Sequence, residues 1–314
     1  MQILKHDTRF DFMARRRTAM MLSGALLAVS LASLAVRGLE LGIDFTGGTL
    51  IEVGYPEAAN LTSVRTTLAL AGFDEAVVQN FGTARDVLVR VAPREDVSKA
   101  ELSSLVLRAL QGADGGVGMQ LRRVEFVGPQ VGEELTEQGG LAMLFALGAI
   151  FIYVMFRFEW KFSAGAVAAL FHDVLITLGV FAVVGFEFDL TVLASLLAVI
   201  GYSLNDTIVV FDRIRENFRK MRRGAAIEIV NASLNQTLSR TLMTSVTTLL
   251  VLTALFFLGG ELIHNFAIAL ITGVVVGTYS SIYVASTTTL ALGISKQDMM
   301  PVAKEGAEGA DASP

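Results

Sequence analysis

The chain has 314 residues, of which 53% are hydrophobic and 18% are charged, and its mean hydropathy is +0.58. Soluble proteins carry about 25% charged residues, so this composition indicates a membrane protein. The net charge of −5 leaves no basic surplus for binding nucleic acid. The absence of cysteine excludes disulfides and thiolate metal sites. We expect neither a metal nor a cofactor, and no enzymatic activity.

A short basic segment opens the chain. Residues 1–17 end in Arg15, Arg16 and Arg17, and we expect this segment to be cytoplasmic. The apolar stretch that follows, 18–36, is longer than the roughly 7–15 residues of a signal-peptide core. It predicts a retained transmembrane helix, which we place at 18–37.

A water-exposed domain is predicted at 38–138, on the exterior side of the membrane. Its elements are an extended segment at 39–53, a helix at 61–71 capped by Asn60, strands at 76–81 and 87–91, a helix near 97–110, and a strand near 118–127. The order β-α-β-β-α-β is that of the ferredoxin-like sandwich. Such an α+β domain is more often a binding module than an enzyme.

The glycine-rich segment 42–48, with sequence GIDFTGG, resembles a phosphate-binding loop only superficially. It has no lysine after its second glycine, as the nucleotide-binding pattern requires. We expect its glycines to form a tight bend between the first helix and the first strand.

Five further apolar runs follow, at 141–156, 163–186, 190–211, 241–258 and 265–292. Each is of a length suited to a hydrocarbon core of roughly 30 Å. The sequence therefore predicts a polytopic α-helical membrane protein, with one transmembrane helix before the domain and a five-helix block at 139–293 after it. Residues 294–314 are predicted to be a disordered cytoplasmic tail.

The basic residues predict the orientation. The short connections near 187–189 and 261–264 contain no Lys or Arg, whereas Arg157, Lys161 and the segment 213–223 are basic. Because basic residues favour the cytoplasmic side, both termini should be cytoplasmic. Basic and apolar residues alternate over 213–239, which predicts interfacial helices.

Ionisable groups inside the predicted spans indicate a structural or functional role, because inserting each into a membrane costs about 2.5–3.5 kcal/mol on insertion scales. The candidates are Asp206, Arg240, His172 and Asp173. Further polar residues accompany them at helical spacing. These supporting candidates are Asn205, Tyr202, Ser203 and Thr244.

Two interpretations of Asp206 and Arg240 remain open. In the first they form a static ion pair that fastens two helices. In the second they are a proton relay: burial favours the protonated carboxyl and a nearby guanidinium favours the carboxylate, so movement of Arg240 would switch Asp206. His172 either extends the proton path or makes a structural hydrogen bond to Asp173 or to a helix backbone. The spacing of Gly273 and Gly277 predicts a tight helix interface.

Six segments carry a resemblance to a known family, and they occur over almost the whole length from about residue 10 to 293. They are GIDFTGG at 42–48, VEFVGP at 124–129, RFEW at 157–160, HD at 172–173, GYSLNDT at 201–207 and FDRIREN at 211–217. The sequence resembles the SecF branch of the SecD/SecF protein-export family, in the RND superfamily.

The resemblance implies a function and partners. The chain would be one RND half, with SecD as the other half, in the bacterial inner membrane. The family uses proton motive force to assist late preprotein translocation. Implied partners are SecYEG, SecA, YajC-like subunits and the preprotein. Proton transport is assigned by similarity to the positions of Asp206 and Arg240.

Two alternatives to this function remain. A stand-alone RND-type exporter of small molecules or lipids would need a second half, which a homodimer could supply. A passive scaffold for the translocase would need the charges only for structure, so that an apolar replacement of both Asp206 and Arg240 would leave it working.

Overall fold

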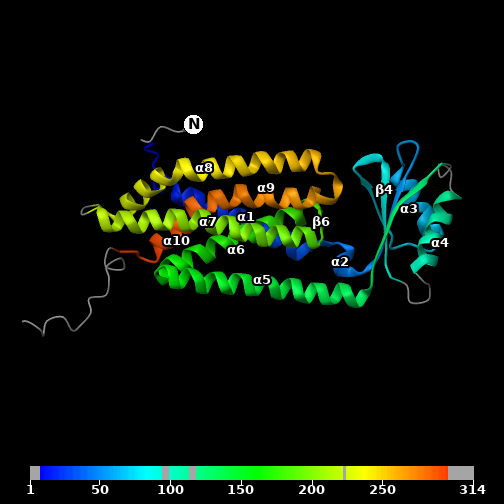
Figure 1. The fold of residues 1–314 in the computed structure, drawn as a ribbon, viewed down its shortest axis with the longest axis horizontal. Coiled ribbons are helices and arrows are strands. Elements are labelled where there is room, and N and C mark those ends of the chain that lie inside the picture. Colours follow the sequence, from blue (N-terminus) through cyan, green and yellow to red (C-terminus); the bar gives the residue numbers. More distant parts are fainter. Residues whose placement is uncertain (1–7, 94–98, 113–117, 222–223, 296–314) are drawn as a thin grey trace, which may run out of the picture.

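The structure is a computed structural model that describes residues 8–93, 99–112, 118–221 and 224–295. It consists of a long helical bundle with an α/β domain at one end, called here the domain end (Figure 1). The first residues of α1 (Arg16–Val36) and the last helix, α10 (Ser286–Ala291), lie toward the opposite end of the bundle. The predicted tail falls almost entirely on 296–314, outside the described residues.

Six helical segments of the described chain are long and apolar enough to cross a membrane. Five of them contain α1 (Arg16–Val36), α5 (Pro129–Arg157), α6 (Trp160–Val184), α7 (Leu190–Lys220) and α8 (Ala226–Leu258). The sixth is α9 (His264–Ser280), which continues through a π-helical turn (Ser281–Ala285) into α10 (Ser286–Ala291). The prediction of a polytopic helical membrane protein is confirmed.

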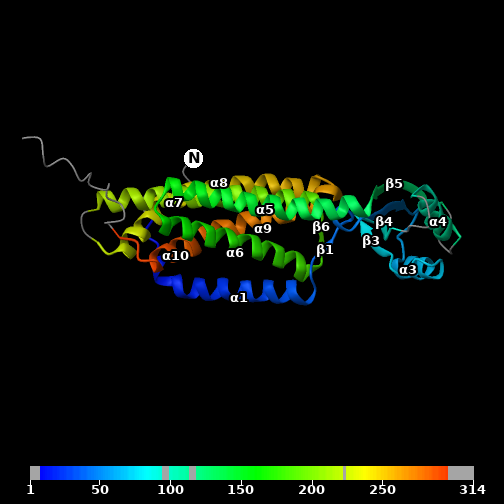
Figure 2. The same ribbon diagram turned by 90° about the horizontal axis from the view of Figure 1, so that it is seen from below.

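The bundle has a shielded centre. In the most apolar part of α6 and of α7, 56% of the residues are buried, and in α9 44%, whereas the share is at most 17% in α1, α5 and α8. Figure 2 shows α1 along one edge, next to α6. Polar side chains on α6, α7 and α9 are therefore enclosed by protein on more sides than those on α8.

Glycines allow the helices of this centre to approach closely. A Cβ atom at Gly277 of α9 would lie 3.0 Å from the Cβ of Ser203 in α7, and one at Gly273 would overlap with Val199 of α7. The predicted tight interface is confirmed, and its partner is α7 of the same chain. Gly179 of α6 meets Ser30 of α1 in the same way.

The α/β domain contains six elements in the predicted order. They are β2 (Gly48–Gly54), α3 (Leu61–Leu70), β3 (Val77–Phe81), β4 (Thr83–Val91), α4 (Lys99–Gln111) and β5 (Gln120–Val127). The sheet order is β3-β4-β2-β5 and every neighbouring pair is antiparallel. This is the ferredoxin-like arrangement, and it confirms the prediction. Its core packs one face of the sheet against both helices, through Ile51, Val53, Leu68, Val87, Val89, Leu102 and Val106.

The prediction of one extended segment at 39–53 is wrong for the middle of that segment. A short strand β1 (Glu40–Leu41) is followed by one helical turn, α2 (Ile43–Thr46), and only then by β2. The turn forms because Phe45 is buried against Phe188 at the domain end of the bundle, with ring centroids 5.7 Å apart. Gly47 and Gly48 have φ values of 68° and 131°, so they make the predicted bend.

The prediction of interfacial helices at 213–239 is also wrong. α7 continues to Lys220, and α8 begins at Ala226. Glu216 supports the end of α7 through ion pairs to Arg213 at 2.8 Å and Lys220 at 2.5 Å. The apolar residues of this segment pack between the two helices instead of facing lipid; they include Ile214, Phe218, Ile229, Val230 and Leu234.

Helix α5 also begins earlier than the predicted five-helix block, at Pro129. Its first turns reach from the bundle to the α/β domain (Figure 1). The division of the chain into domains at 38–138 and 139–293 stays a prediction.

Candidate proton-relay site

Asp206 lies inside the bundle on α7. It is sixteen residues after Leu190, the first residue of α7, which is about 24 Å along the helix. Only 6% of the residue is exposed. Its Oδ1 accepts a hydrogen bond of 2.6 Å from the Thr241 hydroxyl on α8. Its Oδ2 is buried and forms no hydrogen bond of good geometry among the described residues, although the Ser281 hydroxyl is near enough to act on the carboxylate. Since a buried oxygen without a donor holds negative charge poorly, Oδ2 is the atom able to take up a proton.

Arg240 lies on α8, one residue before Thr241, and is exposed in this chain. It acts electrostatically on the Asp206 carboxylate, but no ion pair within 4.0 Å joins the two in the described part of the chain. Asn205 of α7 and Thr244 of α8 are also exposed, and the Thr244 hydroxyl donates to the backbone of its own helix. The direct contact required by the static ion-pair interpretation is therefore missing from this arrangement.

Tyr202 connects three helices one turn away from Asp206. Its hydroxyl donates to Ser245 of α8 at 3.3 Å, and Ser245 in turn shares a hydrogen bond of 2.7 Å with Thr278 of α9. Thr241, Ser245 and Thr278 were not among the residues predicted from the sequence. The spacing of Thr241 and Ser245, four residues apart, was the available signal, because such residues share one face of a helix.

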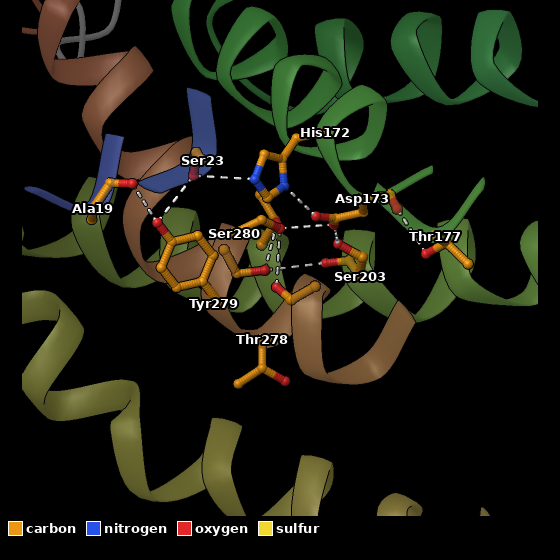
Figure 3. A network of polar contacts seen from close by, with 12 residues as sticks. Ala19, Ser23, His172, Asp173, Thr177, Ser203, Thr278, Tyr279 and Ser280 are labelled. Carbon is orange, nitrogen blue, oxygen red and sulfur yellow. Dashed lines mark hydrogen bonds and ion pairs between the residues drawn. The ribbon is translucent and has the colours of Figure 1, made fainter. Parts of the chain in front are cut away.

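His172 and Asp173 form a second buried polar network in the middle of the bundle (Figure 3). His172 Nδ1 lies 2.9 Å from Asp173 Oδ1, and Nε2 lies 3.1 Å from the Ser23 hydroxyl of α1. Asp173 Oδ2 accepts hydrogen bonds from Ser203 of α7 at 2.5 Å and from Ser280 of α9 at 2.7 Å. The predicted hydrogen bond between His172 and Asp173 is confirmed.

The candidate residues thus divide into two neighbouring groups. Asp206, Arg240, Asn205, Tyr202 and Thr244 lie along α7 and α8, whereas Ser203 binds Asp173 instead of Asp206.

Hydroxyl groups join the two groups. The Ser281 hydroxyl shares a hydrogen bond of 2.9 Å with Thr207, the residue after Asp206, and lies 3.5 Å from the carbonyl oxygen of Ser203. Ser281 opens the π-helical turn after α9. Such turns frequently occur at functional sites.

No cluster of three or more metal-ligating residues occurs within the described ranges. The buried groups at this site are one carboxylate with a free oxygen, a His–Asp pair and several hydroxyls. These groups can hold and pass protons, and they lack the arrangement of a metal centre.

Residues 109–295 match the family described as "Protein export membrane protein SecD/SecF, C-terminal", and residues 32–55 match the "SecD/SecF GG Motif". A "Protein translocase subunit SecF" from Vibrio alginolyticus is 57% identical over 98% of both chains. The chain belongs to the SecD/SecF family. Another SecF subunit, from Escherichia coli O157:H7, is 47% identical over 97% of this chain and 95% of its own length.

Two solved SecDF structures are also similar to this chain. The translocon-associated SecDF from Thermus thermophilus matches 92% of this chain with a TM-score of 0.84 and 40% identity. A SecDF in a "Super-membrane-facing form" matches the same share with a TM-score of 0.69. The two solved chains therefore differ in shape over the matched part. This chain spans 39% of the length of either SecDF chain.

Proposed function

We propose that this chain is the SecF-type subunit of the protein translocase, and that proton uptake and release at Asp206 drives its part in preprotein export. The single observation that carries the mechanism is the Asp206 carboxyl, which is buried mid-bundle with one oxygen bound by Thr241 and the other free. The SecF relatives, similar over nearly their whole length, support the role in translocation.

The coupling step follows from charge. An ionised Asp206 attracts Arg240, and a protonated one does not. Each proton bound or released therefore changes the force between α7 and α8. A charge that crosses a membrane potential of 100 mV supplies about 2.3 kcal/mol, which is enough to shift the population of two helix arrangements about fiftyfold.

The partner proposed for this site is SecD. Arg240, Asn205 and Thr244 are exposed on α7 and α8, two helices that are long and apolar enough to cross a membrane. Such polar groups should face protein or water, and transporters built from two halves place their sites between the halves. The length of the SecDF relatives supports a second half. SecYEG, SecA, YajC-like subunits and the preprotein are the further partners proposed for the assembly.

We place this assembly in the bacterial inner membrane. Arg157, Lys161 and Arg213 lie at the end of the bundle away from the α/β domain. Because basic residues favour the cytoplasm, that end and both chain termini are cytoplasmic, and the domain is periplasmic.

Export into inverted membrane vesicles, with and without a proton gradient, tests the proposal. The Asp206→Asn variant keeps the size of the side chain and an acceptor for Thr241, but it cannot take up a proton. It should fold, bind SecD and export only at the rate that wild type shows without a gradient. Asp212→Asn is the control, because Asp212 is 43% exposed and pairs with Arg157 at 3.0 Å. Gradient-stimulated export by Asp206→Asn would leave the passive scaffold as the better interpretation.

The Thr241 hydroxyl gives a second prediction. Thr241→Val removes the donor to Asp206 while keeping the side-chain shape, so gradient-dependent export should fall about tenfold, as expected for a lost hydrogen bond to a charged group. Thr241→Ser keeps the hydroxyl and should export close to wild type. Equal export rates for the Val and Ser variants, measured in the same vesicles, would contradict the role of this hydrogen bond.

A further inference from the structure

One carboxylate joins the bundle to two strands of the α/β domain. Glu187 lies in β6 (Glu187–Phe188), the short connection between α6 and α7. Its Oε1 lies 3.5 Å from Nη1 of Arg90 in β4, and its Oε2 accepts a hydrogen bond of 3.2 Å from Gln79 in β3. The domain is therefore attached to the bundle by a charged pair in addition to the covalent connections.

Further contacts hold the domain and the bundle together around Glu187. Arg90 also donates a hydrogen bond to the carbonyl oxygen of Leu41 in β1. β1 pairs with β6 in parallel, and Asn265 of α9 donates to the backbone oxygen of Glu187 at 3.0 Å. A Cβ atom at Gly42 would lie 3.1 Å from Glu187 Oε1, so the glycine leaves room for the carboxylate.

The first turn of α7 belongs to this junction. Asp44 of α2 accepts a hydrogen bond of 3.0 Å from the backbone N–H of Leu190, and Asp189 accepts one of 2.8 Å from that of Val192. Phe45 of α2 stacks on Phe188 directly before α7. The start of α7 is thus held by the segment that leads into the sheet of the domain.

The surroundings of Glu187 are mainly acidic. Asp189, Asp44 and the register partner Glu40 are carboxylates, and Arg90 is the cation paired with Glu187. His264, Arg123 and Glu125 line the adjoining cavity of about 580 Å³. Burial raises the pKa of Glu187 above its ordinary value, with Asp189 and Asp44 acting in the same direction and with Arg90 and Gln79 opposing.

We propose that Glu187 and Arg90 are positioning residues that form a coupling clamp, through which movement of α7 at Asp206 is transmitted to the α/β domain. The clamp is at the start of the helix whose middle carries Asp206. A helix passes a rigid-body displacement along its length, but a domain follows only while it is docked on that helix. The inference rests on the proposed function, because it assigns a use to the movement that Asp206 generates.

Removing the cation tests the clamp. Arg90→Met leaves the partly buried Glu187 carboxylate without its paired charge. The docked state is therefore strongly destabilised. The docked population should fall about tenfold, and gradient-dependent export should fall with it. The matched control is Arg122→Met in strand β5 of the same sheet, since Arg122 is 56% exposed and its partner Asp86 lies 3.6 Å away. The control should keep both docking and export.

Docking can be measured in the full chain, reconstituted with SecD in liposomes. The sequence has no cysteine, so Leu70→Cys on α3 and Val36→Cys on α1 allow two spin labels to be attached selectively. Leu70 is 86% exposed and Val36 85%, so neither label disturbs a core. The distance distribution between the labels then reports whether the domain sits on the bundle.

A double variant separates a clamp from an ordinary contact. Replacing both partners, Arg90→Met with Glu187→Leu, should restore docking and export, because a matched apolar pair leaves no buried charge.

Two results would overturn the clamp: an unchanged distance distribution in Arg90→Met, or a double variant that stays undocked. The Asp206→Asn variant should remain docked while losing gradient-dependent export. The export rate of this variant therefore tests the proposed function, and the distances between the labels test the clamp. Failure of the proposed function can thus be distinguished from failure of the clamp.

Discussion

Replacing Asp173 by leucine is expected to destabilise the bundle by about 3–5 kcal/mol, because it leaves buried hydrogen-bonding groups unsatisfied at about 1–3 kcal/mol each. Asp173 is 0% exposed. Its carboxylate binds His172 and accepts hydrogen bonds from Ser203 and Ser280, on three different helices. Leucine would leave His172 and the Ser203 hydroxyl without this acceptor in the membrane interior.

The matched control for this variant is Asp212→Leu. Asp212 forms an ion pair with Arg157, and both side chains are 43% exposed. Exposed pairs contribute about 0–1 kcal/mol, so this variant should unfold almost like wild type. Unfolding in detergent, followed by the fluorescence of Trp160, the single tryptophan, compares the two variants. Equal stabilities would show that burial of Asp173 is not what makes it important.

A valine at Gly179 should detach α1 from the bundle. A Cβ atom at Gly179 of α6 would come within 2.7 Å of Ser30 Cα in α1, so the backbones of the two helices must separate. Overpacking of this kind costs about 1–3 kcal/mol. The separation should also break the hydrogen bond of 3.1 Å between His172 and Ser23 of α1.

Gly24→Val on α1 is the control, because no atom lies within 4 Å of the position of its Cβ. Limited proteolysis of the purified protein should cut Gly179→Val on the N-terminal side of the α/β domain earlier than either Gly24→Val or wild type. Protection of α1 in Gly179→Val equal to that in wild type would mean that α6 and α1 can shift without cost.

The larger features of the fold follow from local patterns. Runs of apolar residues predicted the helices that cross the membrane, and alternation with turn residues predicted the order of elements in the α/β domain. Both depend on neighbours close in the chain. The ends of helices did not follow in this way: α7 runs on to Lys220 because its apolar residues pack on α8, which periodicity alone did not distinguish from packing on lipid.

The candidate site was predicted in part. The cost of a charge in the membrane identified Asp206, Arg240, His172 and Asp173 from their residue types. Ser203 lies only three residues before Asp206 on the same helix, yet residue type did not indicate that it binds Asp173 instead. Residues three apart lie near one face of a helix without pointing in the same direction, so the partners of each depend on which helix lies opposite.

Composition, hydropathy and residue order were enough to establish a membrane protein, its spans and its ferredoxin-like domain, because these properties arise from the preference of each segment for lipid, water or strand pairing. Folding in three dimensions decided the partners of the charges: Thr241 for Asp206, Ser280 for Asp173 and Arg90 for Glu187. These contacts join residues from 35 to 107 positions apart. Helix packing and the docking of the domain select them, and no local pattern in the chain encodes which surfaces will meet.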